Sequence, residues 1–189
     1  TMVDSFEDID TAISQALEVF HIPGISVGII VDNKIVLSRG YGWRNLNQRL
    51  PVTEHTLFPI GSCTKAFTAF MLGQLVDEGK ILWDDPVIKY IPELRFFNAE
   101  LTAQVTIRDL AAHRTGVPRN DVLWIFSKMT RQDAIAVQQH FEPTYSLREK
   151  FLYNNFMYSL AGVVIERVTG QAWEEALSSK IFLPLGMSH

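Results

Sequence analysis

Ser62 and Lys65 are the pair of residues whose types and spacing could carry out nucleophilic chemistry. They stand near the start of a predicted helix over residues 58–79, and residues three apart on a helix share one face, with Cβ atoms about 5 to 6 Å apart. The lysine amine can therefore reach the serine hydroxyl. The helix dipole and apolar neighbours disfavour the ammonium form of Lys65, so a neutral amine could accept the hydroxyl proton. The backbone N–H of Ser62 could also face a developing oxyanion.

The Ser-x-x-Lys spacing is weak by itself, because a match also arises by chance in a chain of this length. A capping Ser62 beside a solvated Lys65 accounts for the same residues equally well. The predicted helix gives the pair more weight, since apolar residues nearly encircle it and indicate a helix within the core. These residues are Cys63, Ala66, Phe67, Ala69, Phe70, Met71, Leu72, Leu75 and Val76. Gly79 is expected to end the helix.

Composition excludes several classes of function. The chain has 189 residues, 47% of them hydrophobic, which is ample for a core. A net charge of −4 and a pI near 5.7 argue against a nucleic-acid partner, and no apolar run has transmembrane length. Cys63 is the only cysteine, and CxxC and HExxH patterns are absent, so no disulfide, metal or other cofactor is predicted. Localisation stays open between periplasmic or secreted with a removed signal, and cytoplasmic.

Periodicity and capping signals predict the elements that position Ser62 and Lys65. A helix over residues 5–20 opens with a capping box at Ser5. Strands 25–31 and 35–41 form a predicted β-hairpin, with the second strand broken at residues 40–42, and a polar connection over 43–56 leads to a short strand at 56–58. Further helices are predicted over 106–112, 130–140, 156–168 and 172–180, the first two opened by capping boxes at Thr106 and Thr130 and the third ended by Gly170.

Other polar residues have a structural and a chemical interpretation. Asp84 and Asp85 could form a carboxylate pair, but Asp-Asp-Pro is far more typical of a helix start. His113 is expected to satisfy the last carbonyls of a short helix rather than to act in catalysis. One of the two asparagines, Asn154 or Asn155, is expected to be a helix N-cap, which is the structural interpretation of Asn155, and Tyr153 could be a buried aromatic residue whose hydroxyl finds a partner.

Two helices taken together, one opened by Ser62-x-x-Lys65 and one preceded by Tyr153-x-Asn155, resemble the serine β-lactamase and penicillin-binding-protein superfamily. The tyrosine form of the second motif is similar to the class C branch, which includes D-alanyl-D-alanine carboxypeptidases, D-aminopeptidases and esterases. Further segments match in the family's order: 22–24, 40–42, 57–65, 84–86, 107–110, 113–116 and 184–187.

The resemblance implies a role for each motif residue. Ser62 would be the acylated nucleophile, and Lys65 and Tyr153 would share the proton transfers, with the main base left open between them. Asn155 would hold Lys65 and the amide carbonyl of the substrate by hydrogen bonds. Asn154 stands where serine is usual, and Arg114 where a small hydroxyl residue is usual, and both departures are expected to alter substrate preference.

The resemblance also implies an α+β, β-lactamase/transpeptidase-like fold. Residues 1–57 would be the N-terminal helix and β-hairpin of a sheet lobe, and residues 58–189 the helical lobe with both motifs. Family members continue beyond the Pro-Leu-Gly-Met segment at 184–187, with three more strands, a Lys-Thr-Gly or His-x-Gly motif and a second oxyanion N–H. The chain is therefore expected to be an amino-terminal part, poorly active alone, with the missing half or a second copy as partner.

The function implied is a serine hydrolase that acts on amide or ester bonds of a small molecule or peptide through an acyl-enzyme on Ser62. Two alternatives come from other classes: a penicillin-recognising binding protein that acylates but turns over too slowly, and a catalytically silent structural homologue. β-Lactams, D-amino-acid peptides and short esters all fit the same four residues.

Overall fold

The computed structural model describes residues 6–125 and 127–187, with side chains described from residue 8. The capping box predicted at Ser5 lies outside the described residues. The chain divides into two compact units, one up to Pro59 and one from Ile60. Within the described part of the chain, no helix is long and apolar enough to cross a membrane.

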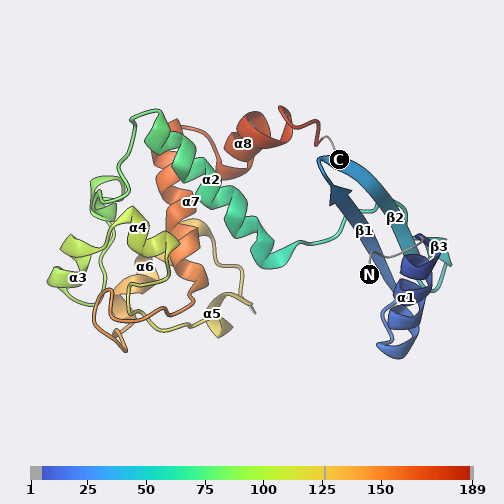
Figure 1. Cartoon of the computed structure of the whole chain (residues 1–189). Coiled ribbons are helices and arrows are strands. Elements are labelled where there is room, and N and C mark those ends of the chain that lie inside the picture. The colour runs from blue at the N-terminus through green and yellow to red at the C-terminus, as the bar shows by residue number, and fades with distance from the viewer. Residues whose placement is uncertain (1–5, 126, 188–189) are drawn as a thin grey trace. The chain divides into compact units, whose positions relative to one another are not determined.

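The first unit is a small antiparallel sheet with one helix (Figure 1). Helix α1 (Phe6–Val19) precedes strands β1 (Gly24–Val31), β2 (Lys34–Asn45) and β3 (Leu50–Pro51), which pair in the order β1-β2-β3. Asp32 and Asn33 form the turn between β1 and β2, and their φ angles of 48° and 60° suit the left-handed turn that matches strand twist. Asp10 on α1 accepts hydrogen bonds from Arg39 and Tyr41 on β2, each at 2.5 Å. The predicted hairpin is confirmed.

Two expectations for this unit were wrong. Strand β2 does not break at residues 40–42, because Gly40 lets the chain of Val52 approach so closely that a Cβ there would lie 2.4 Å from the Val52 carbonyl. The backbone from Trp43 therefore continues the strand and pairs with β3. Residues 56–58 form no strand. Thr53 and Thr56 instead close a local turn, with N–H to Oγ1 at 2.9 Å and N–H to carbonyl at 3.1 Å, and such bonds compete with a strand ladder.

The second unit is helical, and α2 and α7 lie side by side within it (Figure 1). Its elements are η1 (Gly61–Cys63), α2 (Thr64–Asp77), η2 (Val87–Lys89), α3 (Ala99–Gln104), α4 (Ile107–Ala111), α5 (Val122–Ile125), α6 (Arg131–Val137), η3 (Gln138–His140), α7 (Asn155–Thr169), α8 (Trp173–Leu177) and the π-helical turn η4 (Ser178–Phe182). Both predicted capping boxes, at Thr106 and Thr130, are present. Gly79 and Gly170 follow α2 and α7 with φ near +70°, as predicted.

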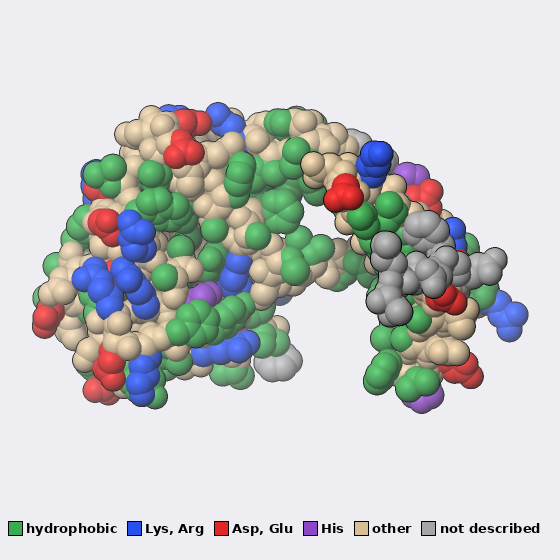
Figure 2. Space-filling model, in the orientation of Figure 1, with side chains coloured by type: hydrophobic (Ala, Val, Ile, Leu, Met, Phe, Trp, Pro, Cys, Tyr) green, Lys and Arg blue, Asp and Glu red, His purple; other side chains and the backbone are tan. Residues whose placement is uncertain are grey.

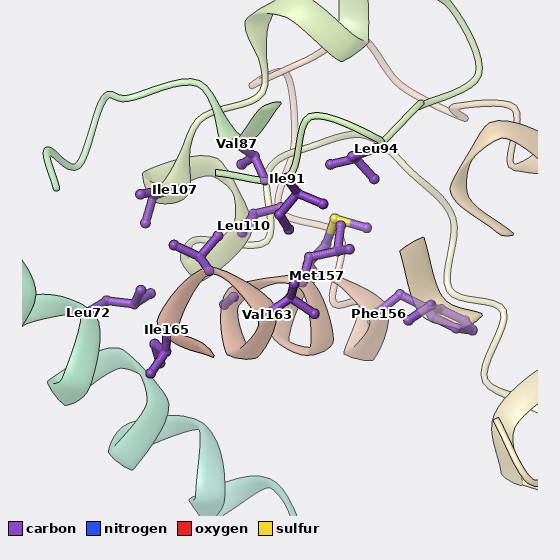
Figure 3. Packing of buried hydrophobic residues seen from close by; sticks show 14 of the residues in the cluster. Leu72, Val87, Ile91, Leu94, Ile107, Leu110, Phe156, Met157, Val163 and Ile165 are labelled. Atoms are coloured by element: carbon purple, nitrogen blue, oxygen red, sulfur yellow. The ribbon is translucent and has the colours of Figure 1, made fainter. Parts of the chain in front are cut away.

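The core of this unit is built around α7. Met157, Leu160, Ala161, Val164 and Ile165 on this helix are completely buried. Figure 3 shows Leu72 of α2 near one end of α7, and side chains of α4 and of residues 87–94 above it. Burying one such large apolar side chain stabilises a fold by about 1.5 to 3 kcal/mol. Helix α7 is thus the rigid support for the motif residues at its start.

Helix α2 is less enclosed than the sequence indicated. Thr68, Met71, Leu72 and Leu75 are buried, whereas Phe70 is 55% exposed in the described residues. Hydrophobic side chains are accordingly visible on the surface of this unit in Figure 2. The apolar residues do encircle α2, but the described part of its own unit covers only one side of it.

Candidate active site

Ser62 lies between two groups that can exchange a proton with it. It belongs to η1, the 3₁₀ turn directly before α2, and Lys65 follows in the first turn of α2. The Lys65 Nζ donates to Ser62 Oγ at 3.2 Å, and Ser62 Oγ lies 2.5 Å from the hydroxyl of Tyr153. The structure therefore brings these three predicted residues together, although Tyr153 is 91 positions away in the chain.

Two neighbouring asparagines at the start of α7 have separate tasks. Asn154 is the N-cap, with its Oδ1 accepting from the N–H of Phe156 at 2.9 Å, and its Nδ2 donates to the carbonyls of Val117 and Pro118. Asn155 is the first helical residue, so the prediction that one of the two asparagines caps the helix is confirmed, with Asn154 rather than Asn155 as the cap. Its Oδ1 accepts from Lys65 Nζ at 2.6 Å. The cap by Asn154 leaves the amide of Asn155 available for the site.

Asp121 fixes the orientation of this amide, and the sequence analysis did not single it out. Its carboxylate accepts from Asn155 Nδ2 at 3.0 and 3.1 Å, from the indole of Trp124 at 3.0 Å, and from Arg119. Burial raises the pKa of Asp121, but hydrogen bonds from Trp124, Arg119 and Asn155 outweigh it and hold the pKa below its usual value. A carboxylate can only accept, so Asn155 must direct its NH₂ towards Asp121 and its oxygen towards Lys65.

Two cations lie close to the ring of Tyr153. The Nζ of Lys65 is 4.8 Å from the ring centroid, and the guanidinium carbon of Arg119 is 5.1 Å from it. Burial raises the pKa of Tyr153, but hydrogen bonding to Lys65 and Ser62 and the two positive charges lower it overall. The phenol thus loses its proton more readily than an ordinary tyrosine, which suits a group that relays protons.

His113 does not take the role expected from its place after α4. Its Nδ1 accepts a hydrogen bond from the backbone N–H of Asn154 at 3.2 Å, so the imidazole is directed to the start of α7 rather than to the carbonyls of α4. Its ring centroid lies 4.6 Å from that of Tyr153 and 5.1 Å from that of Tyr158. Burial, and then the charge of Lys65, lower the pKa of His113.

The backbone before Tyr153 runs along residues 113–118. Gly116 has φ of +77°, and its carbonyl accepts from the N–H of Thr144 at 2.9 Å. The two segments approach so closely that a Cβ at Gly116 would lie 2.0 Å from the carbonyl oxygen of Tyr145. Residues 113–118 therefore hold residues 144–154 in place through backbone contacts.

A buried carboxylate ties the same two segments together. Asp109 accepts from Arg114 at 2.6 Å and from Arg148 at 2.8 Å, and it completes the capping box of α4 with Thr106. Burial raises the pKa of Asp109, but the bonds from Arg148, Thr106 and Arg114 lower it overall. Arg114, one of the departures from the family pattern, thus has a structural partner.

The two aspartates at 84 and 85 do not form a joint site. Asp85 accepts from the N–H of Leu82 at 2.8 Å and from Lys89 at 3.0 Å, while Asp84 pairs with Arg108 at 2.8 Å. They are parts of a turn and an ion pair, and the 3₁₀ helix η2 begins directly after Pro86, so the predicted helix start is present but without a capping bond from either aspartate. Over residues 6–125 and 127–187, no three His, Cys, Asp or Glu side chains come together as metal ligands would.

Comparison with known proteins identifies the family. The model of the Beta-lactamase family matches residues 9–189, nearly the whole chain. The chain belongs to the Beta-lactamase family. Within the family its relatives are of the class C-like branch, and the predicted β-lactamase/transpeptidase-like fold is confirmed.

Relatives of this β-lactamase-family chain include a protein from Staphylococcus aureus and one from Aspergillus violaceofuscus. It is 32% identical to "Protein flp" of Staphylococcus aureus strain COL, over 98% of the chain and 38% of that protein. It is 33% identical to "Unguisins hydrolase ungD" of Aspergillus violaceofuscus, over 96% of the chain and 34% of that protein.

Solved structures show the same relationship. The octameric penicillin-binding protein homologue from Pyrococcus abyssi is 32% identical, with a TM-score of 0.86, over 97% of the chain and 44% of that protein. The D-amino acid amidase from Ochrobactrum anthropi SV3 is 28% identical, with a TM-score of 0.81, over 94% of the chain and 49% of that protein. The chain thus spans less than half the length of these relatives.

Proposed function

We propose that this chain carries the nucleophile of a serine hydrolase that cleaves an amide or ester bond through an acyl-enzyme on Ser62. One observation supports this most strongly: Ser62 Oγ lies 3.2 Å from the amine of Lys65 and 2.5 Å from the phenol of Tyr153. A serine hydroxyl needs such a neighbouring base to become a nucleophile. The names of two relatives, an amidase and a hydrolase, are in line with this proposal.

In the proposed acylation, Ser62 Oγ attacks the carbonyl carbon and forms the C–O bond while its proton passes to Lys65 or Tyr153. Both groups lie within hydrogen-bond distance of Ser62 Oγ, so either can take the proton. The oxyanion faces the backbone N–H of Ser62. As the bond to the leaving group breaks, the amine or alcohol takes the proton. Water then attacks the acyl carbon and gives a proton to the same base; the bond from this carbon to Ser62 Oγ breaks, Oγ takes the proton back, and the carboxylic acid leaves.

Asn155 is proposed to position both the base and the substrate. Its Oδ1 holds Lys65, and its Nδ2, although turned towards Asp121, carries a second hydrogen that can be donated to the amide carbonyl of the substrate. The partners are proposed as well: a small-molecule or peptide substrate, with the second oxyanion donor supplied by sequence beyond this chain or by a second copy.

The direct test is covalent labelling of the full-length protein with a fluorophosphonate and with a fluorescent penicillin. We expect Ser62→Ala to abolish both labels. Ser179→Ala is the matched control, because that hydroxyl donates only to the carbonyl of Ala176 and should leave labelling unchanged. If Ser62→Ala takes up label as fast as the parent protein, Ser62 is not the nucleophile.

A binding function is the second candidate, and the name of the Pyrococcus abyssi homologue favours it. Such a protein would form the same acyl adduct with penicillin but would not release it. The rate of label release separates the two functions. Turnover within seconds identifies a hydrolase, whereas an adduct that persists for hours identifies a penicillin-binding protein.

A further inference from the structure

We propose that His113 is a positioning residue of this site, which holds Tyr153 against Ser62 by fixing the residues on both sides of it and by stacking on its ring. The inference rests on the proposed function, in which Tyr153 relays protons.

His113 makes hydrogen bonds to the residues directly before and directly after Tyr153. The carbonyl of His113 accepts from the N–H of Leu152 at 2.7 Å, and its Nδ1 accepts from the N–H of Asn154 at 3.2 Å. A single residue thus holds the backbone immediately before and immediately after Tyr153. The phenol can therefore move little relative to His113, and its 2.5 Å approach to Ser62 depends on this anchoring.

The packing around the ring of His113 supports the same role. Three aromatic rings surround it, with centroids at 4.6 Å for Tyr153, 5.1 Å for Tyr158 and 5.4 Å for Phe151. His113 also has a left-handed backbone, with φ of +55°, because it ends α4: its N–H donates to the carbonyl of Leu110 at 3.3 Å, and the N–H of Arg114 donates to that of Asp109 at 3.1 Å. This helix end fixes the backbone that carries the imidazole.

The hydrogen bond from Asn154 requires an unprotonated Nδ1, so the proton of a neutral His113 must be on Nε2. The titratable groups that face the ring are Tyr153, Tyr158 and Lys65, and none of them is a carboxylate that could stabilise an imidazolium. At low pH, protonation of His113 at Nδ1 would make this atom a donor, and its N–H would face the backbone N–H of Asn154. Positioning of Tyr153 would then be lost before the chain unfolds.

Two variants separate the acceptor from the rest of the side chain. His113→Asn keeps an oxygen acceptor near the place of Nδ1, and His113→Gly removes it, while both residue types tolerate a left-handed backbone. We expect His113→Gly to lower kcat for an amide about 100-fold with KM nearly unchanged, because small displacements of catalytic groups cost this much. His113→Asn should retain activity within about tenfold of the parent. Its pH profile should also have a less steep acid limb than that of the parent, because asparagine does not titrate, while the part of the limb set by the base beside Ser62 remains.

Several outcomes would overturn the inference without touching the proposed function. One is parent-like kcat and an unchanged pH profile in both folded variants, while labelling still depends on Ser62. Circular dichroism establishes that the variants are folded. If they do not fold, nitrogen NMR of the imidazole in the parent protein decides instead, since a proton on Nδ1 contradicts the proposed hydrogen bond. Labelling that does not require Ser62 refutes the proposed function itself.

Discussion

Replacement of Asp121 by asparagine is expected to slow acylation although Asp121 does not touch Ser62. In the parent protein its carboxylate binds Asn155 Nδ2 through both oxygens, at 3.0 and 3.1 Å. A hydrogen bond to a charged group contributes about 1.5 to 3 kcal/mol. If all of it serves to orient Asn155 towards Lys65, its loss corresponds to about a 10- to 150-fold lower rate. Asparagine keeps one acceptor oxygen, so we expect a decrease in rate near the lower end of this range, about 10-fold.

The assay is kcat/KM of the full-length protein with a chromogenic β-lactam or ester, together with the rate of fluorophosphonate labelling. Asp84→Asn is the matched control, because Asp84 also pairs with an arginine, Arg108, but has a side chain that is 70% exposed. The control should keep the parent rate within about twofold, as exposed ion pairs contribute little. A folded Asp121→Asn protein as fast as this control would show that Asp121 does not orient Asn155.

Three further outcomes are expected. Tyr153→Phe should reduce amide hydrolysis about 10²- to 10⁴-fold but affect a p-nitrophenyl ester less, because nitrophenolate leaves without a proton; equal losses would contradict a proton-relay role. Asp109→Asn should lower the free energy of unfolding by about 3 kcal/mol in urea titrations at pH 7. Because the pKa of Asp109 lies below its ordinary 3.8 in the fold, this difference should begin to shrink as the pH falls below about 4 and should be lost only as the pH passes through the lower folded-state pKa; a constant difference would refute it. Leu160→Ala, at a fully buried position, should cost about 2 to 5 kcal/mol, whereas Leu183→Ala, 65% exposed, should cost far less.

Features set by neighbouring residues were predictable from the sequence. The capping boxes at Thr106 and Thr130 and the left-handed glycine after α7 depend on residues within one helical turn. The approach of Lys65 to Ser62 is of the same kind, because helical spacing alone brings them together. Tyr153 and Asn155 were reached only through the family resemblance, since no local pattern indicates that they meet Ser62 and Lys65.

Features that depend on distant partners were not predictable. Asn154 and Asn155 are equivalent in a local capping argument, and the carbonyls of Val117 and Pro118 favour Asn154. Asp121 lies 34 positions from Asn155, so only the folded structure shows that its carboxylate binds the Asn155 amide. The failed strand at 56–58 has a related cause: its residues suit a strand, but among the described residues they pair with no strand, and the bonds between Thr53 and Thr56 hold a turn instead.

Gly116 shows how a residue with no side chain can set the distance over which a reaction takes place. It acts as a spacer between two main chains, because any larger residue would push back the carbonyl of Tyr145 and the segment that leads to Tyr153. A random mutagenesis screen for lost activity should therefore return Gly116 alongside the motif residues. Its variants would keep all four motif residues, so sequence inspection alone would classify them as competent enzymes.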